Sequence, residues 1–115
     1  MMEKLFKAIQ ELVTTSKVVV ERPKGSVHPR YPDYIYPLNY GYLDNTSSSD
    51  NNCIDVWIGS GDAKLVTGIL LVVDPVKKDS EIKVLIGCDD DESAKALESS
   101  NRGDMAAILI KNGEV

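Results

Sequence analysis

Oxygen-bearing side chains are concentrated in one polar stretch near the middle of the chain. Asp50, Asn52 and Asp55 stand on a loop that runs into an alternating apolar segment. Two carboxylates supplied by a polar loop and the edge of a strand are hard ligands that suit Mg²⁺. The same residues are also typical of a solvated turn followed by a strand, which is the commoner structure. The spacing alone therefore favours a surface turn and leaves a metal site open.

A second charged group follows further along the chain. Asp74, Asp79, Glu81 and Lys83 lie on and beside a predicted hairpin over residues 75–81. Carboxylates beside a lysine could serve a metal and an anion together. Taken alone, however, the pattern is more typical of a charged turn that keeps a strand end soluble.

A basic cluster stands out in this acidic chain. Arg22, Lys24, His28 and Arg30 fall within nine residues, beside Tyr31. Several cations on a backbone held rigid by prolines, Lys24 and Arg30 among them, are a candidate phosphate-binding site. A solvent-exposed basic loop is the equal alternative. His28 is the only histidine, and one imidazole does not make a metal site.

These residues are carried by short elements whose periodicity can be read directly. Leu5, Ile9, Leu12 and Val13 recur at helical spacing and predict an amphipathic N-terminal helix. A short helix with acids in its first turn is predicted over 90–101. Strands are predicted over 17–21, 36–42, 54–58, 64–74, 82–87 and 105–111.

These elements predict a mainly β (α+β) fold. We expect about five of these short strands to form a small closed or nearly closed barrel. One N-terminal helix and a short helix near the C-terminus would pack outside it. No linker or repeat divides the chain, so residues 1–115 are expected to form a single domain.

Composition excludes several classes of protein. Hydrophobic residues make up 43% and charged residues 27%, as in ordinary globular domains. A net charge of −5 argues against nucleic acid as a partner. The longest apolar runs, 69–73 and 105–110, are too short to span a membrane, and the charged N-terminus is unlike a signal peptide. With two cysteines that read as reduced thiols, we expect a cytoplasmic protein.

Read in order, the charged and aromatic residues form a pattern. The segments are ERPKGS at 21–26, Arg30-Tyr31, YPLNYGY at 36–42 and D-x-x-x-x-D-V at 50–56, followed by Asp74 and Lys83. This order, across residues 17–87, resembles the soluble Mg²⁺-dependent inorganic pyrophosphatases of family I.

The resemblance implies a five-stranded OB-like barrel that binds several Mg²⁺ ions. It also implies hydrolysis of inorganic diphosphate to two phosphates by a metal-activated water, without a phosphoenzyme. Diphosphate would be the substrate, and assembly into a homo-oligomer is possible for such a protein.

The resemblance also implies roles for individual residues. Two residues match the family's next metal-binding acid. Asp79 has the family's spacing from Asp74, whereas Glu81 has the family's spacing to Lys83, so either can be this ligand. The implied metal ligands are Glu21, Asp50, Asp55, Asp74 and one of Asp79 and Glu81. The implied phosphate-binding residues are Arg30, Tyr40 and Lys83, and the implied catalytic residues are Asp50, Asn52, Asp55 and Tyr40.

The chain departs from the family pattern at places that bear on turnover. Asn52 stands where the family has an aspartate near the attacking water, and an amide cannot accept that proton. The segment between Tyr31 and Tyr36 is short and lacks the second phosphate-binding arginine of the family. The helical tail is short as well. These differences predict attenuated hydrolysis or, as the alternative, a module that binds metal or phosphate without turnover.

Overall fold

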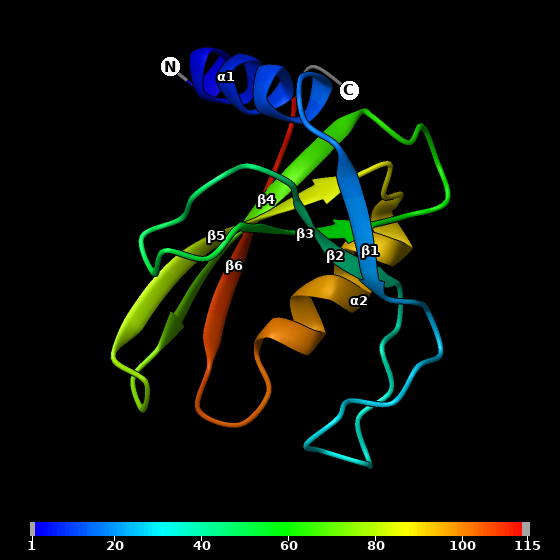
Figure 1. The fold of residues 1–115 in the computed structure, drawn as a ribbon, viewed down its shortest axis with the longest axis vertical. Helices are drawn as coiled ribbons and strands as arrows, with labels where there is room; N and C mark the ends of the chain where they lie inside the picture. The colour runs from blue at the N-terminus through cyan, green and yellow to red at the C-terminus, as the bar shows by residue number, and fades with distance from the viewer. Residues whose placement is uncertain (1, 114–115) are drawn as a thin grey trace.

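The computed structural model describes residues 2–113 as a twisted sheet with one helix on each face (Figure 1). In chain order the elements are α1 (Met2–Thr14), β1 (Val18–Arg22), β2 (Asn39–Leu43), β3 (Ile54–Ile58), β4 (Val66–Asp74), β5 (Asp79–Ile86), α2 (Asp90–Ser100) and β6 (Ala106–Lys111). The mainly β content and the two helices agree with the prediction.

The predicted closed five-stranded barrel is wrong. The sheet has six strands in the order β1-β2-β3-β5-β4-β6, with β3 and β5 parallel and the other pairs antiparallel. Strand β6 pairs with the side of β4 that faces away from β5 and so extends the sheet. Within residues 2–113, β1 and β6 are not paired with each other and remain two separate edges. The sheet is therefore open.

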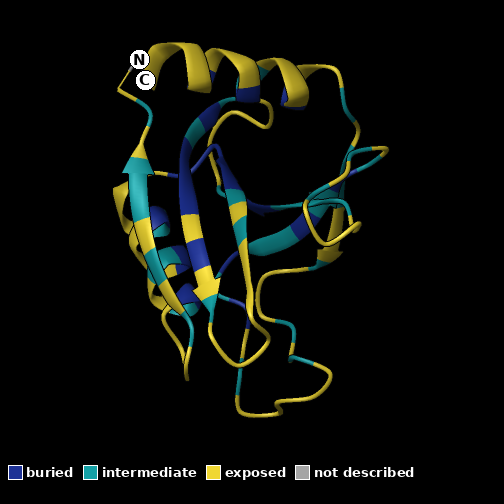
Figure 2. Ribbon diagram, turned by 90° about the vertical axis from the view of Figure 1, so that its left-hand side faces the viewer, coloured by how far each residue is buried: buried dark blue, intermediate teal, exposed yellow. Residues whose placement is uncertain are grey.

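Side-chain alternation divides the core into two apolar layers, one on each face of the sheet. The layer under α1 contains Phe6, Ile9, Val13, Leu43, Val56, Val66, Ile69, Val84 and Ile86. The layer under α2 contains Tyr36, Leu38, Trp57, Leu70, Val72, Leu85, Cys88 and Ala96. Figure 2 shows the resulting alternation of buried and exposed positions along the strands. The alternation in β3 predicted that Asp55 and Trp57 share one face, and both lie on the α2 side.

Helix α1 covers one end of the sheet. Its buried side consists of Phe6, Ile9 and Val13, whereas Leu5 and Leu12, which the helical spacing had placed with the core, are 43% and 42% exposed. The Lys64 ammonium donates to the carbonyl of Val13 at 3.1 Å, so a positive charge caps the negative end of the helix.

The β4–β5 hairpin is tighter than predicted. Strand β5 begins at Asp79, and only residues 75–78 form the turn. One carboxylate oxygen of Asp74 accepts from the backbone N–H groups of Val76 and Lys77 at 3.0 and 3.1 Å. Lys78 has a φ of 58° and reverses the chain. The longer strand carries Asp79 and Glu81 onto the face that holds Lys83.

Strands β1 and β2 approach each other closely at Gly41. A Cβ atom at this position would lie 1.8 Å from the Val19 carbonyl oxygen. Only glycine permits this approach, which fixes the neighbouring residue Tyr40 in the sheet.

Two further observations bear on the sequence predictions. Cys53 and Cys88 are both free thiols. In the described part of the chain, neither helix has the length and apolar character needed to cross a membrane.

Candidate functional site

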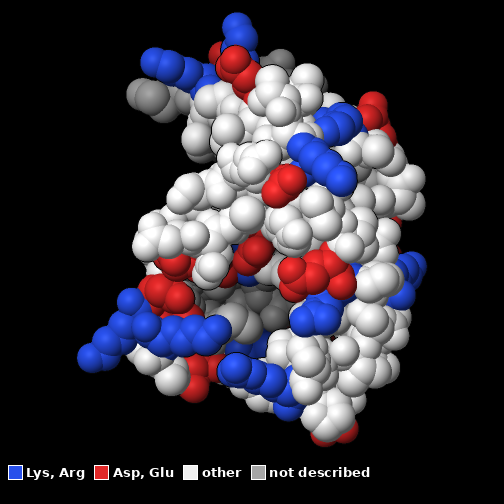
Figure 3. Space-filling view, viewed as in Figure 1, with Lys and Arg blue, Asp and Glu red and all other residues white. Residues whose placement is uncertain are grey.

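The α2 face of the sheet contains an open hollow of about 650 Å³, which we call the central hollow. Its acidic lining residues are Asp50, Asp55, Asp74, Asp79, Glu81 and Asp104, and its cationic lining residues are Lys77, Lys83 and Arg102. Figure 3 shows this hollow in the middle of the face, with acidic side chains mainly above it and basic side chains below. The hollow therefore has an acidic side and a basic side.

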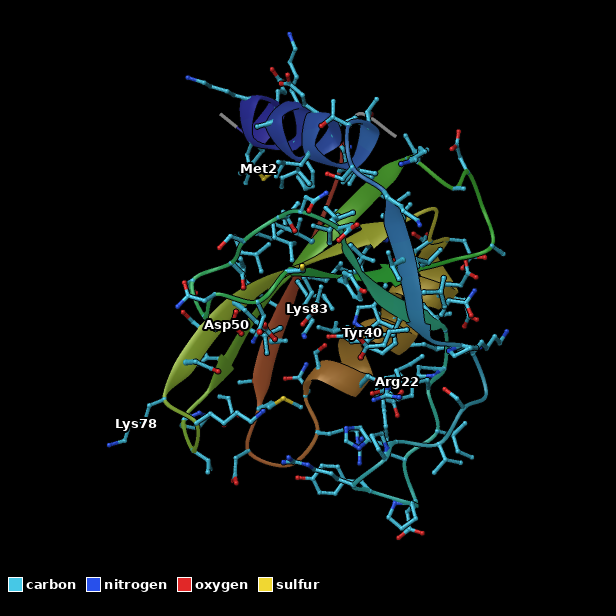
Figure 4. The ribbon with its side chains drawn as sticks, viewed as in Figure 1. Met2, Arg22, Tyr40, Asp50, Lys78 and Lys83 are labelled. Atoms are coloured by element: carbon cyan, nitrogen blue, oxygen red, sulfur yellow. The ribbon has the colours of Figure 1, made fainter. Side chains whose placement is uncertain are left out.

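Strand alternation explains why acids from distant parts of the chain meet here. Asp79, Glu81 and Lys83 occupy every second position of β5, and Asp55 occupies the matching face of β3. Tyr40 of β2 pairs in register with Trp57, which puts its ring beside the same strands. Figure 4 shows Lys83 and Tyr40 together in the middle of the molecule, with Asp50 to one side and Arg22 to the other.

Lys83 is the centre of the polar contacts. Its ammonium lies 2.6 Å from a Glu81 carboxylate oxygen and 3.1 Å from an Asp55 carboxylate oxygen. It also donates to the Tyr40 hydroxyl at 2.6 Å. Only 12% of the Lys83 side chain is exposed, so these bonds are largely shielded from water. One cation thus holds two carboxylates and a phenol in fixed positions.

The same contacts set the ionisation of this group. Burial opposes the charge of Lys83, but the neighbouring Tyr40, Asp55 and Glu81 outweigh it, and the pKa of Lys83 lies above its ordinary value. Burial raises the pKa of Tyr40 although the lysine opposes the shift. At neutral pH the lysine is therefore charged and the tyrosine keeps its proton.

The acidic side contains two carboxylates placed directly opposite each other. Asp74 and Asp79 are register partners at the end of the β4–β5 ladder. Like charges in this arrangement repel. Among residues 2–113, neither carboxylate has a lysine or arginine within ion-pair distance. This pair is a position where a cation would relieve repulsion.

Asp50 is held on the loop before β3. Its carboxylate accepts from the Ser48 hydroxyl and from the Asn52 backbone N–H, the latter at 3.0 Å. The serine bond, followed by the Asn52 bond, lowers the pKa of Asp50. Asp50 is therefore ionised over the neutral range.

The donor chemistry of the acidic side fits a hard divalent cation. Carboxylate oxygens are the ligands that Mg²⁺ prefers, and five of the acids identified from the sequence line one hollow. In the described residues, no three His, Cys, Asp or Glu side chains converge on one point closely enough to form a complete metal site. Water and substrate oxygens would have to complete the coordination, which is usual for Mg²⁺.

The basic side of the hollow is lined by aromatic rings. His28 stacks on Tyr36 with centroids 6.0 Å apart, and Tyr34 meets Tyr36 edge to face at 5.0 Å. Burial and then the charges of Arg22 and Arg102, among others, lower the pKa of His28. The imidazole is neutral at pH 7, so it adds no charge to this side.

The structure brings together most of the residues singled out from the sequence. Those lining the central hollow are Tyr40, Asp50, Asp55, Asp74, Asp79, Glu81 and Lys83, together with His28 of the basic cluster. Glu21, Lys24, Arg30 and Asn52 are not among the lining residues. A carboxylate oxygen of Glu21 lies 3.9 Å from a guanidinium nitrogen of Arg22. The backbone N–H of Arg30 donates to Nδ1 of His28. Asn52 stands beside Asp50 through its backbone N–H.

Sequence reasoning missed several lining residues. Trp57 is only 3% exposed, and in the described chain its indole nitrogen has no hydrogen-bond partner. The alternation in β3 had placed Trp57 on the same face as Asp55, so this residue could have been found. Lys77 and Arg102 carried no local signal, since the hairpin and the loop after α2 bring them to the hollow.

The chain was compared with protein-family models, with curated proteins and with solved structures. The family model described as Inorganic Pyrophosphatase matches residues 4–108. No curated protein is similar enough in sequence to count as a match.

Several solved structures share the fold at low sequence identity. An inorganic pyrophosphatase from Helicobacter pylori superposes with a TM-score of 0.56 at 17% identity, covering 84% of each chain. An inorganic pyrophosphatase from Coxiella burnetii gives 0.53 at 14% identity, covering 82% of each chain. A protein from Anaplasma phagocytophilum described as an inorganic phosphatase gives 0.51 at 18% identity, covering 82% of this chain and 81% of its own. At these identities the likeness concerns the fold alone.

Proposed function

The chain belongs to the inorganic pyrophosphatase family, and from this premise we propose that it hydrolyses inorganic diphosphate to two phosphates in a Mg²⁺-dependent reaction. Water attacks one phosphorus, the bridging P–O bond breaks, and two phosphate ions leave. The observation that carries the proposal is the central hollow, where carboxylates and the cations Lys77, Lys83 and Arg102 line one cavity. The charge distribution of a metal–diphosphate complex is complementary to this lining, because the cation would meet the carboxylates and the anion would meet the cationic side chains.

The metal would be held on the acidic side of the hollow. We assign this role to Asp74 and Asp79, together with Asp50 of the same lining. Asp79 is preferred to Glu81 because Glu81 is already neutralised by Lys83 at 2.6 Å, whereas Asp79 faces only another carboxylate. When bound, Mg²⁺ supplies Lewis acidity, which lowers the pKa of water and neutralises phosphate oxygens.

Lys83 and Tyr40 would contact the substrate. A diphosphate in the hollow meets a lysine that is charged and a phenol that keeps its proton throughout the neutral range. The ammonium stabilises negative charge as it develops on the phosphate oxygens, and the phenol donates a hydrogen bond. Because Lys83 is already held by Asp55 and Glu81, and Tyr40 by its bond from Lys83, little reorganisation accompanies binding.

The proton of the attacking water needs an acceptor. The Asn52 side chain is an amide and cannot serve as one. We assign the acceptor role to Asp55, whose carboxylate lies in the hollow. Since the Lys83 ammonium already contacts an Asp55 carboxylate oxygen at 3.1 Å, this carboxylate is partly occupied when the water must be deprotonated, and we expect slow turnover.

The proposal is tested by measuring phosphate release from diphosphate, with and without Mg²⁺, in wild type and Asp55→Asn. We expect metal-dependent release that falls by about 10²–10⁴-fold in the variant. Asp91→Asn is the matched control, because it makes the same chemical change on an exposed turn of α2 outside the hollow. Equal absence of release in wild type and Asp55→Asn would refute hydrolysis, and the result would then indicate a module that binds without turnover.

A further inference from the structure

Helix α1 covers only one end of its face of the sheet, and an apolar surface continues beyond the helix. We call this surface the sheet patch. Its four side chains are between 36% and 58% exposed: Leu71 and Val73 of β4, Ile82 of β5 and Ile108 of β6. Each lies an even number of positions from a residue in or packed against the layer under α1, so strand alternation puts all four on that face. Figure 2 shows the strands extending past the helix.

The sheet patch is continuous across three strands. Leu71 is the register partner of Ile82 on one side and of Ile108 on the other. Val73 follows two positions further along β4 and is paired with Ala106 of β6. Partners on one face of an antiparallel pair have their Cβ atoms about 5 Å apart, so these side chains contact one another. None of the five is charged, and a contiguous exposed apolar surface of this kind marks an interaction site.

The outer edge of β6, next to the sheet patch, is already occupied. The Asn101 side chain donates to the Ala107 carbonyl at 3.2 Å and accepts from the Ala107 N–H at 2.9 Å. Towards the other end of the strand, the Lys111 ammonium lies 2.7 Å from an Asp90 carboxylate oxygen of α2. Backbone groups that are already bonded offer no template for a further strand. A partner would therefore pack on the face of the sheet and not along its edge.

The amount of exposed surface fits a second copy of the chain as this partner. The accessible surface is 7114 Å². A folded monomer of 12.6 kDa exposes about 6,200 Å². The difference, about 900 Å², is close to the roughly 800 Å² that each partner contributes to an interface of standard size.

We propose that the chain forms a two-fold dimer in which the sheet patches of two copies pack face to face. In a two-fold interface the same surface meets itself, and an uncharged apolar surface is complementary to itself. Packing removes Leu71, Ile82 and Ile108 of each copy from water, which stabilises the association. The central hollow lies on the opposite face of the sheet and stays open in both copies, so association of this kind is independent of diphosphate hydrolysis.

Sedimentation equilibrium of the full chain over a wide range of protein concentration measures the dimer directly. Ile108→Thr keeps the β-branched shape that suits a strand but makes the side chain polar. It should raise the dimer dissociation constant by about tenfold or more, because each substitution changes both halves of the interface. Ile35→Thr is the matched control. Ile35 and Ile108 are both 58% exposed, but Ile35 lies in the 23–38 segment, outside the patch, so this variant should associate as wild type does.

Thermal melting separates loss of the interface from loss of folding. Because only the folded chain dimerises, Tm of wild type should rise with protein concentration. In Ile108→Thr this rise should be smaller, whereas at the lowest concentration the two proteins should melt at the same temperature. A variant that melts lower at every concentration, with the same concentration dependence as wild type, would count against the dimer.

Three further results would overturn the proposed dimer. The first is a wild-type chain that remains monomeric at every concentration, and the second is an equal effect of Ile108→Thr and Ile35→Thr. The third is an assembly that weakens as salt is added, because screening should favour an apolar interface between copies of net charge −5. Assemblies that keep growing with concentration would likewise indicate a head-to-tail contact in place of the two-fold one.

Discussion

Lys83 is the residue on which the polar structure of the hollow depends. Its ammonium contacts Asp55, Glu81 and Tyr40, and its side chain is only 12% exposed. Removing the cation leaves two carboxylates without a partner in a partly dry site. The same residue therefore bears on both stability and substrate binding.

Replacing Lys83 by methionine separates charge from chain length, since methionine keeps an unbranched apolar stem. We expect the free energy of unfolding to fall by about 2 kcal/mol, less than for a fully buried pair, because Asp55 and Glu81 are 32% and 25% exposed. Urea denaturation at pH 7 without metal measures this change. Lys95→Met, which breaks an exposed pair on α2, should cost less than about 0.5 kcal/mol. Equal effects of the two substitutions would contradict the special position of Lys83.

Among the elements, α2 is positioned by a capping box that also ties it to another loop. The Asp89 carboxylate accepts from the Glu92 N–H at 2.8 Å, and Glu92 accepts in return from the Asp89 N–H at 3.0 Å. Glu92 also accepts from the backbone N–H of Ser60 at 2.9 Å, in the loop after β3. This carboxylate therefore fixes both the start of the helix and the helix's distance from β3.

Glu92→Ala should lower the free energy of unfolding by about 1–2 kcal/mol at pH 7. Burial opposes ionisation here, but the bonds from Asp89 and Ser60 outweigh it, so the pKa of Glu92 lies below its ordinary value of 4.5. A lowered pKa contributes stability above pH 4.5, and this part is lost as the pH falls through the folded value. Denaturation at pH 7 and at pH 3 checks this. If the free energies of unfolding of wild type and Glu92→Ala differ as much at pH 3 as at pH 7, a charged cap is excluded. The exposed substitution Asp91→Ala is the control.

Sequence periodicity predicted the elements well because each carries its own local signal. The acids at the start of α2 and the alternation in β3 depend on nearest neighbours alone, and both predictions are confirmed. Whether β1 and β6 meet depends on strand pairing over long sequence distances, which no local pattern contains, and the predicted barrel was wrong. Asp74 and Asp79 could be proposed as site residues because they flank a hairpin that is visible in the local sequence. Arg102 could not be proposed, because its position in the hollow depends on how α2 packs.

On the scale of the whole molecule, the hollow is lined by parts that lie far apart in the sequence. Its acidic side belongs to the β3, β4 and β5 strands, and its basic side belongs to the 23–38 segment and the loop after α2. A ligand that contacts both sides adds bonds between these parts in the folded state, and the unfolded chain cannot make them. Binding should therefore raise the stability of the entire fold.

Thermal melting with Mg²⁺ and imidodiphosphate, a diphosphate analogue whose P–N–P bridge resists hydrolysis, measures this linkage. At a ligand concentration of about 100 Kd, the folded state gains roughly 2.7 kcal/mol. For a chain of this size, that gain raises Tm by roughly 10 °C. The analogue without metal should raise Tm less, because Asp74 and Asp79 then repel it uncompensated. The additional rise in Tm that Mg²⁺ gives should be smaller in Asp79→Asn than in wild type. In Glu81→Gln this rise should persist, since Glu81 is paired with Lys83. The reverse order would assign the metal to Glu81 and refute the choice of Asp79.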